Sequence, residues 1–363
     1  MAQAPEEEAT DGGDLEEDNE IERITLLRLG GSIPADRGDG RFIPIWVLGH
    51  YDRSVFDSDI SLSAWLKTSR QEITLRAPIG STFHAGVEIR GEIISADDAP
   101  FRYVNGERIS GRAFRASTAG AALFGGFKTD GGITGSARYL LRHYFFADGE
   151  DTDDTFILPG ENTTHGGRVD FGWRKIRTFQ QTEIRDGMQA GVFAEYEHRD
   201  AWKGWGDDPE TLDRYRDAQS YFRYGGHVGI YLRFLKHHGF DVDLAARFGE
   251  DLDFLSEYTV GSELSYQRVV GYYYAEFRSR RVLIANLRYG ANLWDGARGS
   301  LIFDLAGFRA ADDWDLISGI GVALRQKIWL GIPVVLQYGY GIDARREGSR
   351  GGHEIFLSVT AAF

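Results

Sequence analysis

The sequence of 363 residues contains no cysteine, only 8 prolines and no long apolar run. The missing cysteine excludes a disulfide framework, a thiolate metal site and a thiol nucleophile. No window approaches the roughly 18 uninterrupted apolar residues of a membrane-spanning helix, which excludes a helical membrane protein. The low proline count and the lack of a collagen-like period exclude fibrous and wholly disordered chains.

Glycine and aromatic residues, in contrast, are both abundant. There are 46 glycines, well above the usual level of about 7%, and aromatic residues make up 13% of the chain. The length allows two or three soluble domains, or one large closed β structure.

Negative charge is concentrated at the N-terminus. The net charge is −14, and residues 1–20 hold nine acidic residues and no basic one, which leaves −5 for the other 343 residues. A segment so charged and so poor in apolar groups cannot bury enough surface to offset the entropy of ordering. We therefore expect an acidic disordered tail over 1–20 and one barrel domain over 21–363. Because no basic stripe is present to attract phosphates, we expect no nucleic-acid partner.

From about residue 22 onward apolar residues alternate with polar ones, which is the period of a β-strand. In the segment 83–93 the apolar face consists of Phe83, Ala85, Val87, Ile89 and Ile93, and the polar face of His84, Glu88, Arg90 and Glu92. A half-solvated sheet in a soluble sandwich shows the same alternation. However, charged residues recur on the polar face, and no amphipathic helix is evident to cover the continuous apolar face. Lipid outside and water inside is the simpler arrangement.

The alternation predicts sixteen strands, an even number as in bacterial single-chain barrels. They lie near 22–30, 41–50, 59–67, 71–78, 83–95, 109–127, 132–146, 166–177, 189–199, 221–236, 239–249, 280–292, 297–307, 314–326, 332–342 and 353–363. Tight connections such as 128–131 alternate in phase with the longest ones, 147–165, 200–220 and 250–279, as in outer-membrane barrels. Only the 178–188 link fits this phase imperfectly. We predict an all-β, closed antiparallel transmembrane barrel of about 16 strands in the outer membrane of a Gram-negative bacterium.

The C-terminal third contains the most informative motifs. The run Arg268-Val269-Val270-Gly271-Tyr272 is followed by Leu301-Ile302-Phe303-Asp304-Leu305-Ala306-Gly307, and later by Gly319-Ile320-Gly321 and Gly339-Tyr340-Gly341. Five predicted strands follow the first run, and the chain ends on the aromatic Phe363. These features resemble the BamA/TamA-type outer-membrane assembly and secretion barrels, also called the bacterial surface antigen family.

The resemblance implies a long loop six that folds into the lumen and carries a Val-Arg-Gly-Phe/Tyr motif. Val269, Gly271 and Tyr272 match this motif, whereas Val270 stands at the arginine position. In the family the motif implies a loop lock, in which a cationic side chain inside the barrel pairs with a wall carboxylate.

The candidate lock partners are Asp304 in the wall and one of three loop arginines, Arg268, Arg278 or Arg280. Arg268, two residues before Val270, is a substitute for the motif arginine. The other interpretation is that these arginines are solvated and make no special contact.

The resemblance also implies a function in outer-membrane protein or lipid assembly or in translocation. Members of the family normally carry periplasmic POTRA domains before the barrel. Here an acidic segment of about twenty residues takes that place, so the resemblance implies a POTRA-less member served by a periplasmic partner protein, with client chains and outer-membrane lipid as further partners. The weak point would be the seam between the first and last strands, where unpaired backbone groups would template a client strand. The predicted seam residues are Ile24, Leu26, Ile355, Leu357, Val359 and Phe363.

Two other functions stay open from the sequence. Charged inward residues, among them Arg90, Asp241 and Arg247, favour a passive diffusion channel, and the third class is a structural or adhesion barrel. We predict no enzyme, no catalytic residue, no cofactor and no metal site. His237 and His238 lie in a predicted turn without a third ligand, and the acidic loop 148–161 lacks ordered ligand spacing.

Overall fold

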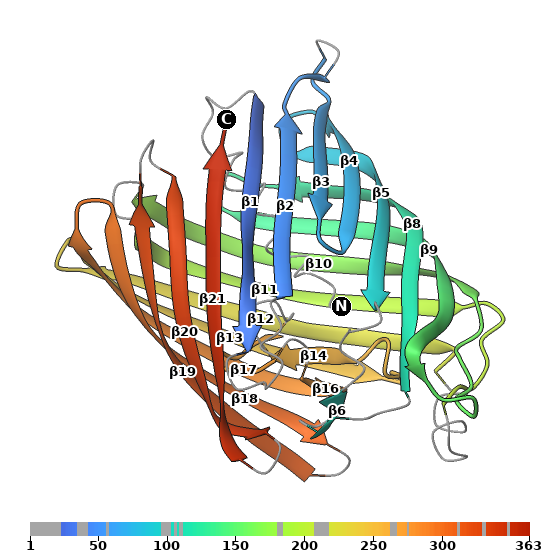
Figure 1. Cartoon of the computed structure of the whole chain (residues 1–363). Coiled ribbons are helices and arrows are strands. Elements are labelled where there is room, and N and C mark those ends of the chain that lie inside the picture. Colours follow the sequence, from blue (N-terminus) through green and yellow to red (C-terminus); the bar gives the residue numbers. More distant parts are fainter. Residues whose placement is uncertain are drawn as a thin grey trace.

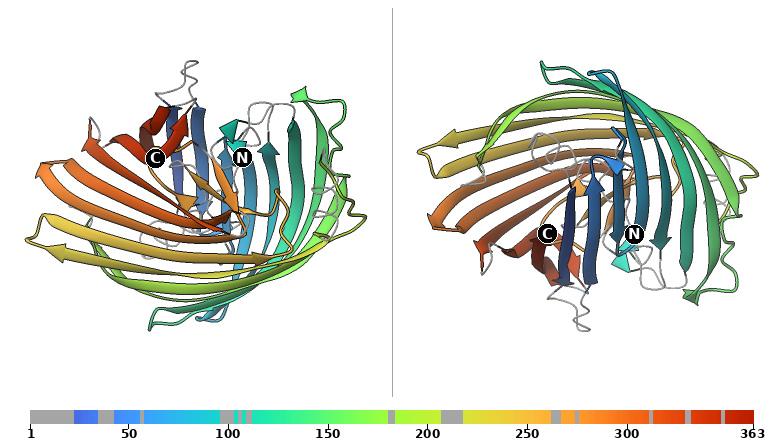
Figure 2. Two further views of the ribbon diagram at one scale, coloured as in Figure 1. Left: turned by 90° about the horizontal axis from the view of Figure 1, so that it is seen from below. Right: turned by 90° about the horizontal axis from the view of Figure 1, so that it is seen from above.

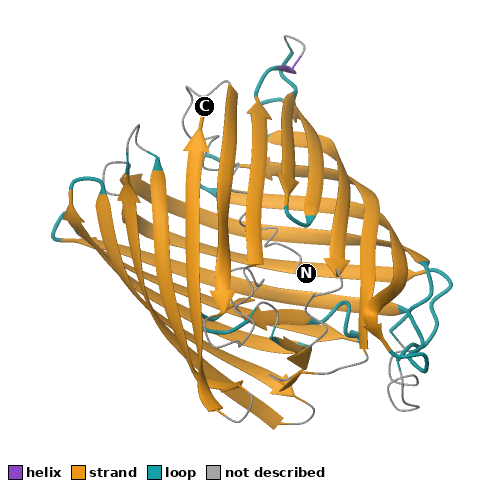
Figure 3. Cartoon of the chain, viewed as in Figure 1, coloured by secondary structure: helices purple, strands orange, loops and turns teal. Residues whose placement is uncertain are grey.

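The computed structural model is a closed barrel made from one antiparallel sheet (Figure 1). It describes residues 23–34, 43–55, 58–95, 103–104, 107–108, 112–179, 184–206, 218–261, 267–273, 276–310, 313–328, 332–346 and 349–363. The predicted acidic tail, residues 1–20, lies outside these ranges. Strands make up most of the described chain (Figure 3). Among the described residues there is no helix long and apolar enough to cross a membrane.

Sixteen strands follow one another around the barrel in chain order, and the last pairs with the first. Their bounds are β1 Arg23–Pro34, β2 Ile43–Asp52, β3 Ser61–Lys67, β4 Arg70–Ile79, β5 Phe83–Ser95, β8 Arg112–Lys128, β9 Ile133–Thr152, β10 Asn162–Phe179, β11 Ile184–Arg199, β12 Ser220–Phe234, β13 His238–Glu250, β17 Arg281–Trp294, β18 Ala297–Ala310, β19 Asp313–Lys327, β20 Pro333–Arg346 and β21 Ser349–Ala362. Each corresponds to one predicted strand, so the predicted fold class and strand number are confirmed. A short hairpin, β6 Tyr103–Val104 with β7 Glu107–Arg108, lies between β5 and β8.

From β4 to β18, short and long connections alternate between the two ends of the barrel. The turns 129–132, 235–237 and 295–296 lie at the rim where the chain ends, and the segments 153–161 and 200–206 lie at the opposite rim (Figure 1). We call these the short-turn rim and the long-loop rim. The link that fitted the predicted phase imperfectly is short after all, because β10 runs to Phe179 and β11 begins at Ile184. The phase of the connections is therefore regular at this link as well.

The distribution of polar and apolar side chains is inverted relative to a soluble protein. On β5, Phe83 and Ile89 expose 57% and 63% of their surface. Glu88 and Arg90, the two neighbours of Ile89, expose only 4% and 6%. The apolar face points outward and the charged face inward. This inversion suits a wall with lipid outside, where the backbone groups are satisfied between strands and the barrel leaves no free edge.

The seam between β1 and β21 is a continuous ladder. Its register runs from Leu26 opposite Ala362 to Pro34 opposite Glu354. Beyond the first of these pairs, the backbones of Thr25 and Phe363 exchange both hydrogen bonds, at 3.1 and 2.9 Å. The barrel is thus closed by main-chain pairing along nearly the whole of β1.

Candidate functional site: loop six and the barrel seam

Loop six connects β13 to β17, and its described residues, 251–261, 267–273 and 276–280, fold back inside the ring (Figure 2). Its strand β14 Tyr258–Gly261 pairs with β15 Gln267–Arg268 and with β16 Phe277–Ser279. Buried apolar side chains of the loop and of the wall form one core, which includes Val260, Val269, Tyr272, Phe277, Phe308 and Ile317. The inward-folding loop six that the family resemblance implied is therefore present.

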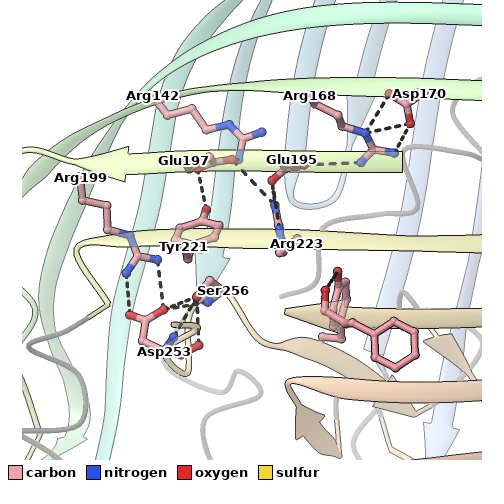
Figure 4. A network of polar contacts seen from close by, with 12 residues as sticks. Arg142, Arg168, Asp170, Glu195, Glu197, Arg199, Tyr221, Arg223, Asp253 and Ser256 are labelled. Carbon is pink, nitrogen blue, oxygen red and sulfur yellow. Dashed lines mark hydrogen bonds and ion pairs between the residues drawn. The ribbon is translucent and has the colours of Figure 1, made fainter. Parts of the chain in front are cut away.

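The base of loop six, which we define as residues 251–256, is held by a buried ion pair (Figure 4). Nη1 and Nη2 of Arg199, at the end of β11, each lie 3.0 Å from a carboxylate oxygen of Asp253. The hydroxyl and the backbone amide of Ser256 donate to the same carboxylate at 2.6 and 3.0 Å, and the indole of Trp205 donates at 3.3 Å. Burial raises the pKa of Asp253, but Arg199 and Ser256 outweigh it, so the pKa is lowered overall. Asp253 is thus held as a carboxylate.

Replacing Asp253 by Asn should weaken this base anchor, because it leaves the Arg199 charge buried without its partner. The expected loss in free energy of unfolding is about 3–5 kcal/mol, measured by urea titration in detergent micelles. The matched control is Asp170→Asn, whose carboxylate pairs with Arg168 but is 37% exposed; such a pair contributes about 1 kcal/mol or less. Equal losses for the two variants would contradict the anchor.

The pH dependence of this anchor follows from the lowered pKa of Asp253. A carboxyl whose pKa is lower in the folded state stabilises that state fully above the unfolded value, about 3.9. The stabilisation is lost as the pH falls through the lower folded-state pKa. We therefore expect the difference between the wild type and Asp253→Asn to persist at neutral pH and to shrink only in acid, below about pH 4.

The wall beside the anchor carries further buried charges from neighbouring strands (Figure 4). Glu197 lies 3.4 Å from Arg142, and Glu195 pairs with Arg223 and lies 3.6 Å from Arg168. The two carboxylates of β11 are thus surrounded by arginines of β9, β10 and β12. Because opposite charges lie side by side, these groups stiffen the wall on which the base of loop six rests.

The tip of loop six, which we define as residues 268–272, lies on a platform of four glycines in the wall. Gly319 and Gly321 of β19 are directly opposite Gly341 and Gly339 of β20. A Cβ atom on Gly319, Gly339 or Gly341 would overlap the backbone of residues 270–271. Only glycine lets the backbone of the loop approach the backbone of the wall so closely.

Asp304 of β18 is the fully buried carboxylate beneath the tip. It accepts hydrogen bonds from the backbone amide of Val270 at 3.0 Å and from the side chain of Asn286 at 2.8 Å. Nε of Arg268 lies 3.7 Å from Asp304 Oδ2, within ion-pair range but too far for a good hydrogen bond. Val270, at the family's arginine position, therefore contacts Asp304 through its main chain.

The other two candidate arginines make hydrogen bonds within loop six. Arg278 donates to the carbonyl of Phe254 at 2.7 Å, and Arg280 donates to the carbonyl of Leu252 at 2.5 Å. Both contacts tie the returning half of the loop to its base. Of the three candidates, Arg268 is the one that lies beside Asp304 at the tip.

The hydroxyl of Tyr272 fixes the tip to the backbone of two wall strands. It donates to the carbonyl of Ser318 at 3.1 Å and accepts from the amide of Asp343 at 3.2 Å. Burial raises the pKa of Tyr272, so the hydroxyl keeps the proton that it donates. The tyrosine of the motif thus recognises main-chain groups of β19 and β20.

Glu354 of β21 joins the tip to the seam. Its Oε1 accepts from the hydroxyl of Ser32 on β1 at 2.7 Å, and its Oε2 accepts from the backbone amide of Gly271 at a longer 3.4 Å. Both Ser32 and Glu354 expose only 2% of their surface. One buried carboxylate therefore contacts the first strand, the last strand and loop six.

The predicted seam residues lie on the two strands that close the barrel. Leu26 is opposite Ala362, Val359 opposite Leu29, Leu357 opposite Gly31 and Ile355 opposite Ile33. Phe363 pairs with Thr25 through its backbone. Ile24 lies beyond the last seam pair and is opposite Tyr51 of β2 instead.

Sequence reasoning missed the Arg199–Asp253 anchor, the glycine platform and the link through Glu354. The platform left one readable signal, since Gly319-x-Gly321 and Gly339-x-Gly341 each place two glycines on one face of a strand. The anchor and the link left none, because their partners come from elements far apart in the chain.

Comparison with known proteins shows which of them share this sixteen-stranded closed barrel. No protein-family model and no curated protein matches the sequence. Among solved structures, the chain is similar to BamA from Haemophilus ducreyi lacking POTRA domains 1–3, with 13% identity, a TM-score of 0.64 and coverage of 93% of this chain and 70% of that chain.

The chain is also similar to two CdiB structures. CdiB from Acinetobacter baumannii has 10% identity and a TM-score of 0.60, over 94% of this chain and 60% of that chain. CdiB from Escherichia coli has 10% identity and a TM-score of 0.61, over 95% of this chain and 63% of that chain. This chain thus spans less than two thirds of either CdiB chain. At such low identities the likeness shows a shared barrel fold.

Proposed function

We propose that the chain is an outer-membrane barrel that assembles or translocates proteins or lipids, and that it opens at the β1–β21 seam. The observation that supports this most is the Glu354 carboxylate, which contacts Ser32 of β1 and Gly271 of loop six from its place on β21. A passive pore has no need to tie an internal loop to its closing seam. Undocking of the tip would remove one partner of Glu354 and weaken the contact that the same carboxylate makes across the seam.

The partners that we propose follow from the two surfaces involved. The apolar exterior suits outer-membrane lipid. An opened seam would expose unpaired backbone groups on β1 and β21, which can add a strand of a client chain. A periplasmic protein that presents clients at the short-turn rim completes the proposal.

The proposal is tested with the purified full chain in liposomes. We expect it to accelerate the insertion of a urea-unfolded small barrel client by at least about tenfold. Because Glu354→Gln and Ser32→Ala both weaken the side-chain contact that holds the seam closed, we expect each to raise that rate further. The matched control is Glu92→Gln, a buried inward carboxylate on β5. No acceleration by the wild-type chain would overturn the proposal.

A diffusion channel is the second candidate, and the inward charges are what favoured it. Several of them are engaged in ion pairs: Glu88 lies 2.7 Å from Arg90, and Asp241 lies 2.9 Å from Arg185. With loop six docked inside the ring, we expect a low and flickering conductance in planar bilayers. A large and steady conductance would favour the channel instead.

A further inference from the structure

We propose that His165, His198 and Asp200 form a binding site for a divalent transition-metal ion such as Zn²⁺. Among the described residues these three bring their ligand atoms within 4.8 Å of one another. Asp200 Oδ1 lies 3.9 Å from His165 Nε2 and 3.8 Å from His198 Nε2. The proposal does not depend on the function proposed above.

The barrel itself positions the three side chains. His165 of β10 and His198 of β11 are directly opposite each other in the register of the two strands. Asp200 follows the end of β11 and is held by a backbone hydrogen bond from its amide to the carbonyl of Thr163, at 2.8 Å. Both histidines therefore stand on neighbouring strands of a rigid sheet, so little ordering is needed to bring the ligands together.

The site lies on the outer face of the wall at the long-loop rim. Side chains alternate along a strand, so His165 shares the outward face of Val169, and His198 shares that of Tyr196; these two neighbours are 55% and 50% exposed. The side chains of His165, His198 and Asp200 are 40%, 32% and 59% exposed. An ion arriving from water at this rim can reach all three.

The donor set fits zinc. Two imidazole nitrogens and one carboxylate oxygen are common zinc ligands, with a fourth tetrahedral position left for water. Ligand atoms around a tetrahedral zinc ion are about 3.4 Å apart, given bonds of about 2.0–2.1 Å, so the two separations between Asp200 and the histidines, 3.9 and 3.8 Å, need to close by about half an ångström. Nδ1 of His198 lies 2.7 Å from the hydroxyl of Ser220. If Nδ1 donates its proton to that hydroxyl, the lone pair of Nε2 faces Asp200, which is how a second partner usually orients a metal-binding histidine.

We predicted no metal site from the sequence. The two histidines of this site belong to different strands, and only the register brings them together. Of the two histidines that we had considered, His237 lies in the turn at the short-turn rim and His238 is the first residue of β13. They serve as a control, since two adjacent histidines can bind metal ions without a built site.

The test uses the full chain, purified without a histidine tag, in detergent micelles. Calorimetric titration with zinc chloride should show one saturable site with a micromolar dissociation constant. His165→Ala, His198→Ala and Asp200→Asn should each weaken binding at least tenfold, and Ser220→Ala by about tenfold. His143→Ala, which removes an outward imidazole from β9, and the double variant His237→Ala/His238→Ala should leave the affinity unchanged. Lowering the pH should weaken binding, because protonated imidazoles do not bind metal.

A spectroscopic readout separates the site from adventitious binding. With one equivalent of Cu²⁺, electron paramagnetic resonance should show two bound nitrogens in the wild type and one in His198→Ala. Retained heat-modifiable gel mobility would show that each variant is folded. The absence of saturable binding below about 1 mM, or binding that disappears only in the His237/His238 double variant, would overturn the proposal.

Discussion

A disulfide between β1 and β21 should reduce client insertion to the rate of protein-free liposomes, and reduction of the disulfide should restore it. Thr25 and Phe363 exchange both backbone hydrogen bonds, so the pair three positions further on, Arg28 and Thr360, is of the non-hydrogen-bonded kind. Such pairs have Cα atoms about 4.5 Å apart, within the span of a disulfide. Because the chain has no cysteine, Arg28→Cys/Thr360→Cys introduces the only thiols.

The control disulfide belongs in a part of the wall that need not open. Arg174 and Gln189 are opposite each other on β10 and β11. The hydrogen bond from the Asp200 amide to the Thr163 carbonyl fixes the phase of this ladder, and by that phase Arg174 and Gln189 also form a non-hydrogen-bonded pair. Oxidised Arg174→Cys/Gln189→Cys should insert clients at the wild-type rate. Full activity of the oxidised seam variant, with the cross-link verified by mass spectrometry, would sink lateral opening.

The barrel could be predicted from the sequence because the alternation of polar and apolar residues can be read within each strand alone. Outward and inward faces differ in polarity along every strand, so residues such as Ile89 and Glu88 identify both the strand and its direction of burial. The ends of the strands were predicted less accurately than their number and order. The strand β9 runs to Thr152, although its last residues, Gly-Glu-Asp-Thr, show no apolar alternation, because it extends past the apolar band. The short strands inside loop six have two to four residues, too few to show a period.

Within the candidate site, only contacts between two charged side chains could be predicted from the sequence. The proximity of Arg268 and Asp304 followed from charge and from the family resemblance. The amide of Val270 and the amide of Gly271 make contacts that any residue could make, so no residue type announces them. Glu354 is one of many inward carboxylates, and its link to Ser32 exists only because the barrel closes on itself.

Replacing Gly271 by Ala should release the tip of loop six from the wall. The φ angle of Gly271 is +83°, in the left-handed region that costs other residues roughly 1–2 kcal/mol. An added Cβ would also overlap the backbone of Tyr340 and Gly341. Those groups belong to the hydrogen-bonded wall and cannot retreat without breaking the ladder, so the tip moves instead. We expect protease cleavage within loop six to become at least tenfold faster, and the mean conductance in planar bilayers to rise.

The matched control is Gly80→Ala, which separates backbone strain from collision. Gly80 has a similar φ angle of +71°, but nothing lies within 4 Å of an added Cβ there. Equal effects of the two variants would show that strain alone matters and that the tip does not depend on its close approach to the wall. If Gly271→Ala frees the tip while client insertion is unchanged, the lock exists but does not act on the seam. The contact between Gly271 and Glu354 would then be structural, and the proposed function would lose its main support even though the barrel and its docked loop stand.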